Sequence, residues 1–353
     1  MRVSLTRSKE VFNFCEPYVI AEIGANHNGD MDLAKELIKQ AKKAGADCVK
    51  FQSWSKESIF SRSKYEKNYF LQDDYRGRSD TNLEQIVEKY SMSEQELLSM
   101  KEYADSVGID FTSTPFSIRE VDFLVEILKA PFIKVASMDL NNYPFLKYIS
   151  QKKLPIILST GLSELYQIDR AVKTIEEQGN TNIVILHCVS IYPPEDSQVN
   201  LNNITTLQTV YPSYPVGFSD HSLGSPIPLA SVTKGACVIE KHFTLDKGME
   251  GWDHKVSADF DELQQICFES KRIYRALGSA RIDAVENTER KNEFRRSIVL
   301  TRSMSRGEVI KGTDLDFKRP GTGLPPEMYE MVVGLTLTKD KEEDSILTKD
   351  DFI

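Results

Sequence analysis

The feature that most limits how this chain can fold is a series of short, β-branched apolar runs that alternate with amphipathic stretches. The eight runs are Tyr18–Ile23, Asp47–Gln52, Asp110–Ser113, Phe132–Val135, Ile156–Ser159, Ile183–Cys188, Val216–Ser219 and Val238–Phe243. Helical spacing of apolar residues separates most of them, as in Asp32–Ala44, Ser93–Val107, Ile118–Leu128, Ser163–Gln178 and Asn200–Val210. Alternating strands and helices form a parallel sheet, and eight repeats favour an α/β fold of the (β/α)₈ TIM barrel type.

An open, doubly wound sheet is the competing architecture. It would require a glycine-rich phosphate turn after an early strand. The segment after the first run, Gly24–Gly29, reads GANHNG and does not match G-x-G-x-x-G. The sequence therefore favours the barrel.

Composition narrows the class of protein. The chain has 353 residues, 40% of them hydrophobic, and a formal net charge of −9. It has too much apolar content for a disordered chain, and no run approaches the roughly 18 apolar residues of a membrane span. Lys and Arg are not clustered, so we expect no nucleic-acid partner and no membrane partner. The five cysteines form no CxxC pair and Met1–Glu10 lacks a signal core, so we predict a reducing, cytoplasmic location.

The chain is predicted to divide into a barrel and a small appendage. We expect a catalytic barrel over residues 1–280, a linker over 281–296 and a second domain over 297–353, because the pattern changes to short strands and turns. A domain this small has little core of its own, so it is expected to dock on a larger surface or a neighbouring protomer. Within the barrel, the long connection Ser53–Ser91 is either a lid or binding element or an ornamental or disordered insertion.

Polar residues stand at or just after the end of every predicted strand, where the reactive groups of such barrels lie. They include Glu22, Lys50, Gln52, Thr114, Lys134, Ser137, Ser159, Ser190, Tyr192, Ser219, His221, Glu240 and His242. Lys50 and Lys134 are flanked by apolar residues, so each ammonium must pair with an anion. With the nearby hydroxyls they would form a phosphate cradle, or they would pair with Glu22 and Glu240 inside the barrel.

His221 and His242 end two neighbouring predicted strands, which brings their imidazoles close together. Two histidines with oxygen ligands suit a divalent first-row metal that keeps open positions for substrate. Glu240 shares the strand face of His242 and is a candidate ligand or outer-shell residue. The alternative is a pair of hydrogen-bonded barrel histidines without a metal, and a closed zinc site is disfavoured because no cysteine accompanies them.

These residues belong to motifs that resemble the sialic acid synthase (N-acetylneuraminate synthase) family over nearly the whole chain. The motifs are Tyr18–Gly29, Val49–Gln52, Ser113–Ser117, Ile157–Gly161, Gly217–His221 and Ile239–Thr244. In the tail, Lys318–Gly323 (KRPGTG) is similar to the antifreeze-like SAF domain of that family, a β-clip fold.

The resemblance implies a reaction. Phosphoenolpyruvate would condense with an open-chain N-acylated hexosamine and water, giving a nine-carbon 3-deoxy-2-ulosonic acid and phosphate. The acceptor would be N-acetylmannosamine or a diacetamido-trideoxyhexose, the precursor of legionaminate or pseudaminate. It also implies a divalent metal, Mn²⁺ or Mg²⁺ with Co²⁺ as a further candidate, held by His221 and His242.

The resemblance also implies roles for single residues. Glu22 matches a catalytic carboxylate, and Asp139 stands where many relatives carry Glu. The positions that match the phosphoenolpyruvate site are Lys50, Thr114, Lys134, Ser137, Ser159 and Ser219. Those that match the sugar side are Gln52, Ser190, Tyr192 and Asp253, although Asp253 could equally cap a turn and some neuraminate-forming relatives have Asn in place of Ser190.

Arg319 matches an SAF-domain arginine that reaches into the partner's site, which implies a domain-swapped homodimer. A solvated surface arginine is the alternative. Two other functions remain open at this point: a related phosphoenolpyruvate condensation such as 3-deoxy-octulosonate phosphate synthesis, and a non-catalytic carbohydrate-binding protein. The first lacks an SAF-like tail in its known members, and the second would not need a metal site combined with an acid.

Overall fold

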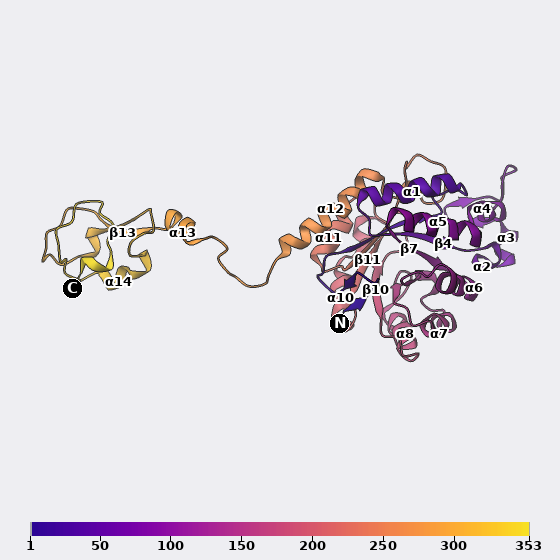
Figure 1. The fold of residues 1–353 in the computed structure, drawn as a ribbon, viewed down its shortest axis with the longest axis horizontal. Coiled ribbons are helices and arrows are strands. Elements are labelled where there is room, and N and C mark those ends of the chain that lie inside the picture. Colours follow the sequence, from indigo (N-terminus) through magenta and orange to yellow (C-terminus); the bar gives the residue numbers. More distant parts are fainter. Residues whose placement is uncertain (1, 353) are drawn as a thin grey trace. The chain divides into compact units, whose positions relative to one another are not determined.

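The computed structural model describes residues 2–352 and divides into two compact units between Gly278 and Ser279 (Figure 1). The stretch 281–296, expected to be a linker, contains one helix, α13 (Thr288–Phe294). Within the described residues, no helix is both long and apolar enough to span a bilayer.

The first unit is built on eight parallel strands that fall on the eight predicted runs. They are β3 (Tyr18–Gly24), β4 (Cys48–Ser53), β7 (Asp110–Pro115), β8 (Ile133–Val135), β9 (Ile156–Ser159), β10 (Ile183–Cys188), β11 (Val216–Asp220) and β12 (Val238–His242). Their order is β7-β4-β3-β12-β11-β10-β9-β8, and β7 lies beside β8. Across that seam Thr112 Oγ1 donates a hydrogen bond to the carbonyl of Phe132 at 2.9 Å. The nearly closed sheet confirms the predicted TIM barrel.

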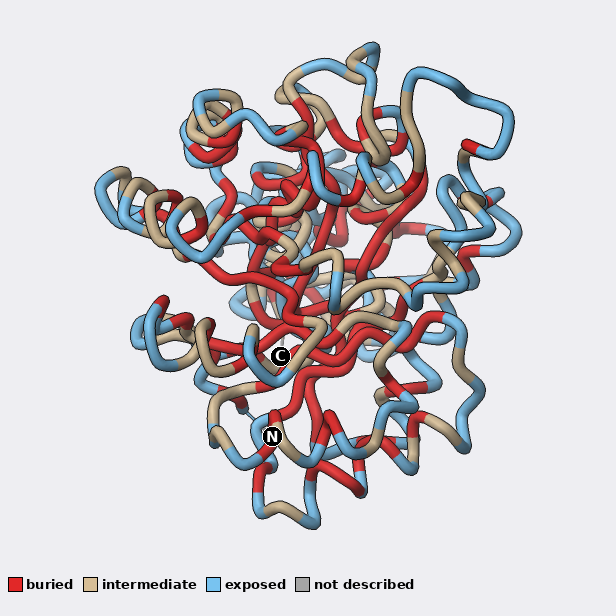
Figure 2. Tube along the Cα trace, turned by 90° about the vertical axis from the view of Figure 1, so that its right-hand side faces the viewer, coloured by how far each residue is buried: buried red, intermediate tan, exposed pale blue. Residues whose placement is uncertain are grey.

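A helix follows each strand, and these helices surround the sheet. They are α1 (Met31–Ala44), α5 (Glu94–Val107), α6 (Ile118–Asp122), α7 (Tyr143–Gln151), α8 (Leu165–Glu176), α10 (Asn202–Val210), α11 (Pro226–Thr233) and α12 (Phe260–Leu277). Figure 2 shows the buried strands at the centre and exposed segments around them. The predicted helix Ile118–Leu128 is α6 followed by a π-helical turn, Phe123–Ile127, in which the Leu128 amide bonds to the Phe123 carbonyl.

Helix α1 shows how local sequence sets these elements. Asp30 caps its first turn, because Oδ1 accepts hydrogen bonds from the amides of Asp32 and Leu33 at 2.8 and 3.1 Å. Its buried face includes Leu37 and Ile38, at the spacing expected for a helix packed on a sheet. Gly45 ends it at φ 93°, a left-handed conformation that favours glycine.

The amino end of the barrel is closed by a short hairpin, β1 (Val3–Ser4) paired with β2 (Glu10–Val11). Its apolar side chains pack with inward-facing strand residues such as Ile157 and Val184 in one buried cluster. Chemistry is therefore restricted to the opposite, carboxyl end of the strands.

The long connection between β4 and α5, here called the insertion (residues 53–91), is folded. It contains α2 (Lys56–Ile59), α3 (Arg62–Lys67), the strand pair β5 (Tyr69–Phe70) and β6 (Asp73–Asp74), and α4 (Leu83–Tyr90). Aromatic residues hold it together around a separate apolar cluster that includes Trp54, Tyr75 and Tyr90. None of these helices and strands was predicted from the sequence, which indicated only a long connection.

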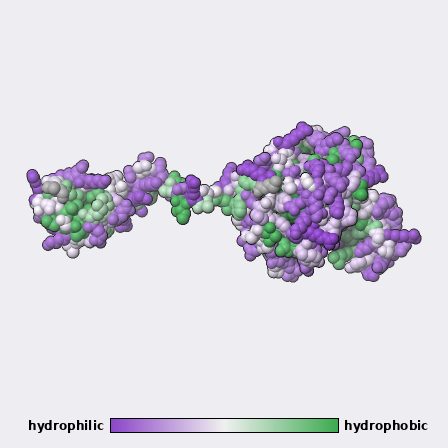
Figure 3. Space-filling view, turned by 90° about the horizontal axis from the view of Figure 1, so that it is seen from below, coloured by the Kyte–Doolittle hydropathy of each residue, from purple (hydrophilic) through white to green (hydrophobic). Residues whose placement is uncertain are grey.

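The second unit has its own small core under a predominantly hydrophilic surface (Figure 3). Its strands β13 (Ser297–Leu300) and β14 (Leu315–Lys318) pair antiparallel, and α14 (Tyr329–Val332) follows. The core includes Ile298, Leu300, Leu337 and Leu347. Asp351 is fully buried and pairs with Lys339 and Lys341 at 2.8 and 3.0 Å, which ties the end of the chain to this unit.

Candidate active site

A cavity of about 410 Å³ lies at the carboxyl ends of the barrel strands. Its lining contains all the predicted site residues except Asp139 and Arg319. The predicted residues that line it are Glu22, Lys50, Gln52, Thr114, Lys134, Ser137, Ser159, Ser190, Tyr192, Ser219, His221, His242 and Asp253. The barrel therefore brings together side chains that are separated by up to 231 positions in the chain.

The polar and charged strand-end residues that line the cavity are here called its floor, and they include two charged pairs. The first pair joins Glu22 and Lys50. The strand register places His242, Glu22 and Lys50 side by side on β12, β3 and β4. Lys50 Nζ lies 2.6 Å from Glu22 Oε2 and donates to Thr114 Oγ1 at 2.9 Å. Gln52 Nε2 donates to the other carboxylate oxygen, Glu22 Oε1, at 2.7 Å. Each member of the ion pair is thus held in one position before any substrate arrives.

Burial shifts the proton affinity of this pair. It raises the pKa of Glu22 to about 7, with a further increase from the nearby Glu240 charge that the Lys50 ammonium partly offsets. Burial alone would lower the pKa of Lys50, but the carboxylates of Glu22 and Glu240 raise it above its ordinary value. Near neutral pH Lys50 is therefore a cation, while Glu22 is able to gain or lose a proton.

The second charged pair joins Lys134 and Glu240. Lys134 Nζ lies 3.4 Å from Glu240 Oε1 and donates to Ser159 Oγ at 2.8 Å, while Ser219 Oγ donates to Glu240 Oε1 at 3.0 Å. Burial lowers the pKa of Lys134. Glu240 Oε2 is buried and has no hydrogen-bond partner among residues 2–352, so the floor retains an unused acceptor.

The hydroxyls of Ser137 and Ser190 flank a point of close approach at Gly161. Ser137 Oγ accepts the Gly161 amide at 3.0 Å. A Cβ at Gly161 would collide with Ser190 Oγ and lie 2.7 Å from Ser137 Oγ. Glycine at this turn lets the loops after β8, β9 and β10 meet beside the cavity.

His221 and His242 lie together at the ends of the neighbouring strands β11 and β12, with ring centroids 5.5 Å apart. His221 Nδ1 donates to the Val189 carbonyl at 2.7 Å, so Nε2 is the nitrogen that could bind a cation when the ring is neutral. Burial alone would lower the pKa of His221, but the neighbouring Cys188 raises it above its ordinary value. The Tyr192 ring packs against His221 with centroids 4.1 Å apart. Burial, followed by the charges of His221 and Lys50, holds the pKa of His242 well below its usual range, so its imidazole is neutral.

A buried ion pair fixes the two strands that carry these histidines. Lys241 Nζ lies 2.7 Å from Asp220 Oδ2 and also donates to the Ser222 carbonyl. Asp220 directly precedes His221, and Lys241 directly precedes His242. Because both charges are almost fully buried, the pair sets the spacing of β11 and β12 at this level.

The donor set at this point suits a divalent cation. His242 Nδ1 is buried, has no hydrogen-bond partner within the described chain, and lies 3.8 Å from Asp253 Oδ2. Burial raises the pKa of Asp253 to about 6, the usual consequence of removing a carboxylate from water. Residues 2–352 contain no group of three or more His, Cys, Asp or Glu arranged to hold a metal. A bound ion would therefore take His221 and His242 from the chain and complete its shell from substrate or water.

The same cavity has an apolar wall, made of Trp54, Ile59, Phe60, Phe70 and Leu71 from the insertion and Trp252 from the loop after β12. Trp252 is its centre: its ring stacks on Phe70 with centroids 5.1 Å apart and packs on Trp54 at 5.7 Å. Trp252 Nε1 donates to Tyr75 Oη at 3.3 Å. The insertion is thereby attached to the loop that carries Asp253.

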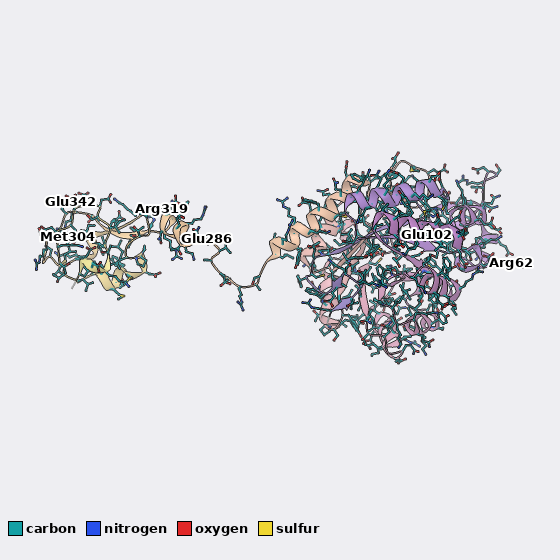
Figure 4. The ribbon with its side chains drawn as sticks, viewed as in Figure 1. Arg62, Glu102, Glu286, Met304, Arg319 and Glu342 are labelled. Carbon is teal, nitrogen blue, oxygen red and sulfur yellow. The ribbon has the colours of Figure 1, made fainter. Side chains whose placement is uncertain are left out.

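Two predicted residues lie elsewhere. Asp139 is outside the cavity lining, because the turn Ser137–Asp139 places Ser137 and Met138 there instead. Its Oδ1 accepts a hydrogen bond from Asn142 Nδ2 at 3.1 Å. Arg319, labelled in Figure 4, belongs to the second unit, where its exposed guanidinium lies over the Phe294 ring at 5.2 Å. Its reach into a partner's site stays a prediction.

Sequence comparison identifies both units. The NeuB family profile matches residues 37–282, and the SAF domain profile matches residues 295–353. The chain belongs to the NeuB family. This confirms the resemblance seen in the strand-end motifs and in the KRPGTG tail.

Curated and solved relatives agree with the assignment. An N,N'-diacetyllegionaminic acid synthase of Campylobacter jejuni is 38% identical over 93% of this chain and 98% of its own length. The human N-acetylneuraminate-9-phosphate synthase is 34% identical over 94% of this chain and 91% of its own. The crystal structure of the Leptospira borgpetersenii sialic acid synthetase in complex with citrate matches with a TM-score of 0.73 at 31% identity. It covers 82% of this chain and 94% of its own.

The geometry adds residues that the sequence reasoning did not select. Glu240 was predicted either to pair with a buried lysine or to serve as a metal ligand or outer-shell residue, and the structure shows the pairing, because Glu240 contacts Lys134 and Ser219. The apolar wall was not selected at all, since its members are spread between positions 54 and 252. The one available signal was the aromatic content of the long connection.

Proposed function

We propose that this NeuB-family protein is a nonulosonic acid synthase. It would condense phosphoenolpyruvate with an N-acylated hexosamine and water, and release phosphate and a 3-deoxy-2-ulosonic acid such as N-acetylneuraminate, legionaminate or pseudaminate. The observation that carries the proposal is that two buried lysines and two histidines line one cavity at the strand ends. Its relatives include synthases of N,N'-diacetyllegionaminic acid, pseudaminic acid and N-acetylneuraminate 9-phosphate.

Phosphoenolpyruvate is the anion that the cavity floor suits best. Lys50 and Lys134 supply two ammonium groups that are almost fully buried, where each interacts more strongly with an anion than it would at the surface. Around them stand four hydroxyl donors, those of Thr114, Ser137, Ser159 and Ser219. We propose that these groups bind the phosphate and carboxylate of phosphoenolpyruvate and keep them immobile during the reaction.

A divalent metal ion, Mn²⁺ or Mg²⁺ with Co²⁺ as a further candidate, is part of the proposal. His221 and His242 would hold it through neutral imidazole nitrogens. When bound, the ion supplies Lewis-acid polarisation of the sugar aldehyde. Asp253, 3.8 Å from His242 Nδ1, would orient that imidazole or a sugar hydroxyl beside it.

Glu22 is the proposed proton carrier. Carbon 3 of phosphoenolpyruvate forms the new bond to the aldehyde carbon, whose oxygen then takes a proton. A water oxygen adds to carbon 2, and the bond from carbon 2 to the phosphate oxygen breaks. Burial places the pKa of Glu22 at about 7, which suits a group that gives up one proton and regains another near neutrality. Gln52 and Lys50 hold its two oxygens in place meanwhile.

The sugar would occupy the outer part of the cavity. Gln52, Ser190, Tyr192 and Asp253 line it there and offer hydrogen bonds to hydroxyl or amide groups. We further propose a domain-swapped homodimer in which Arg319 completes the partner's site. Among residues 2–352 no carboxylate forms an ion pair with Arg319 in this chain, so its fork of donors is available. The five free cysteines suit the reducing cytoplasm in which we place the enzyme.

The test is phosphate release from phosphoenolpyruvate with the metal present, with and without N-acylated hexosamines, followed by the mass of the product. We expect release only with a sugar and a product that contains the sugar, the three-carbon unit and one water oxygen. Release without any sugar, or unchanged phosphoenolpyruvate with every sugar, would contradict the proposal. For Arg319, heterodimers that combine Arg319→Ala with Glu22→Gln protomers should regain some activity if the arginine acts across the dimer.

A further inference from the structure

We infer that the apolar wall selects an acceptor sugar whose end remote from the aldehyde carries a methyl group and an acylamido group. A hydroxymethyl or phosphorylated end would be disfavoured. This inference rests on the proposed function, because it concerns the sugar that the synthase uses. It identifies a specificity element in the insertion, whose residues carry no role in the proposed chemistry.

The charged and the apolar residues that line the cavity come from different segments of the chain. Every charged group that lines it comes from a strand end or from the loop after β12. The insertion contributes a single polar side chain, Gln72, and five apolar ones, those of Trp54, Ile59, Phe60, Phe70 and Leu71. The two ends of a bound sugar would therefore meet different surfaces, the reacting end the charged residues and the opposite end the apolar ones.

The chemistry of the floor fixes which end of the sugar meets the wall. The aldehyde must lie beside His221, His242 and the phosphoenolpyruvate held by the two lysines. The remaining carbons of an open-chain hexose then extend away from the strand ends. Trp252 borders this direction, since it adjoins Asp253 in sequence and stacks on Phe70. The far end of the sugar is thus placed against aromatic and aliphatic surface.

Apolar surface at this position disfavours polar substituents. A hydroxyl that loses water without gaining a hydrogen-bond partner binds less well, whereas methyl and acetyl methyl groups gain from the contact. A phosphate would need a cation, and no lysine or arginine of the insertion lines the cavity. Lys56 instead pairs with Glu84 and Glu88, and Arg78 pairs with Asp73 and Asp80.

Leu71 offers the cleanest substitution, because its side chain is 82% exposed and lines the cavity without supporting the core. Leu71→Lys adds a cation at the wall. The matched control is Phe268→Lys on α12, since Phe268 is 68% exposed and outside the cavity lining. Three acceptors are compared by phosphate release: a 2,4-diacetamido-2,4,6-trideoxyhexose, N-acetylmannosamine and N-acetylmannosamine 6-phosphate.

For the unaltered protein we expect kcat/KM with the trideoxy sugar to exceed that with N-acetylmannosamine by about 10- to 100-fold, and the phosphorylated sugar to be poorest. Leu71→Lys should raise kcat/KM for the 6-phosphate at least about tenfold, and Phe268→Lys should leave all three values unchanged. Equal or better use of either other sugar by the unaltered protein would overturn this inference and leave the proposed function intact. No gain for the 6-phosphate in Leu71→Lys would overturn the assignment of selection to the wall. No phosphate release with any of the three would overturn the proposed function, and the inference with it.

Discussion

The polar floor of the cavity and its apolar wall are held in place by different kinds of interaction. On the floor, ammonium and carboxylate groups pair on adjacent strands, as Lys50 and Glu22 do at 2.6 Å with only 2–3% of each side chain exposed. The wall consists of aromatic and aliphatic side chains on short elements and loops, as where Phe70 on β5 stacks on Trp252. The register of the parallel strands sets the positions of the floor residues, whereas packing between side chains mainly sets the positions of the wall residues.

This difference separates reaction from recognition. Floor positions follow from the barrel itself, since the register aligns His242, Glu22 and Lys50 across three strands. Apart from Trp252, which lies in the loop after β12, the wall positions belong to a connection between β4 and α5 that can change in sequence without disturbing that register. A family built this way can keep one reaction and vary its sugar. Substitutions in the floor should therefore affect turnover with every sugar, and those in the wall should affect the choice among sugars.

The largest effect is expected from breaking the floor pair with Lys50→Met. The change removes one of the two cations proposed to bind phosphoenolpyruvate and leaves Glu22 buried without its partner. We expect phosphate release to fall about a thousandfold or more, and the free energy of unfolding to fall by about 3–5 kcal/mol. Steady-state kinetics and urea unfolding measure the two.

A surface pair provides the control for that experiment. Lys39 Nζ lies 3.0 Å from Glu36 on the exposed face of α1. Lys39→Met should change stability by less than about 1 kcal/mol and leave turnover as it is. Equal effects of the two substitutions would show that burial does not distinguish the floor from the surface.

The next largest effect concerns the metal. Treatment with EDTA followed by gel filtration should abolish turnover, and added Mn²⁺ should restore it. His221→Ala should lower both turnover and the affinity for Mn²⁺, measured by calorimetry, at least about a hundredfold, because one of the two proposed protein ligands is lost. His187→Gln is the matched control, since His187 also ends a barrel strand but bonds to the Val199 carbonyl outside this cavity. Full activity after EDTA treatment would show that the reaction does not need a metal ion at His221 and His242.

A smaller effect should appear in the pH dependence of stability. Burial raises the pKa of Glu22 from its ordinary 4.5 to about 7, so the folded state holds this proton more tightly than the unfolded state. The stabilisation is present in full below pH 4.5 and is lost as the pH rises through 7. Urea unfolding between pH 4.5 and 7.5 should show that Glu22→Gln loses less stability over this range than the unaltered protein, by up to about 3 kcal/mol. A parallel dependence in both proteins would place the Glu22 pKa near 4.5 in the fold.

Much of the floor could be predicted from the sequence, because two regular patterns determine it. The β-branched runs identified all eight strands, and the rule that reactive groups follow strand ends identified Lys50, Lys134, His221 and His242. Each of these predictions needs only residues a few positions apart.

The remaining features depend on contacts between distant positions. The contact of Trp252 with Phe70 spans the chain from the loop after β12 to the insertion, and no periodicity reports it. Asp139 was selected by matching a motif, yet one turn of 3-10 helix places it outside the lining. The partner of Glu240 was also open, because alternation fixes its strand face but does not decide between Lys134 and a metal.

The smallest predicted effect tests the wall at its centre. Trp252→Ala removes the ring that contacts Phe70, Trp54 and Tyr90, and with it the support for Asp253. Because the phosphoenolpyruvate groups of the floor do not depend on this ring, the KM for the sugar should rise about tenfold while the KM for phosphoenolpyruvate stays within about twofold. Trp252→Phe keeps an aromatic ring but loses the hydrogen bond to Tyr75, so it should recover most of the sugar affinity. A rise in both KM values, or a loss of kcat alone, would mean that the wall and the floor act as one unit. Recognition of the sugar would then not be confined to the wall.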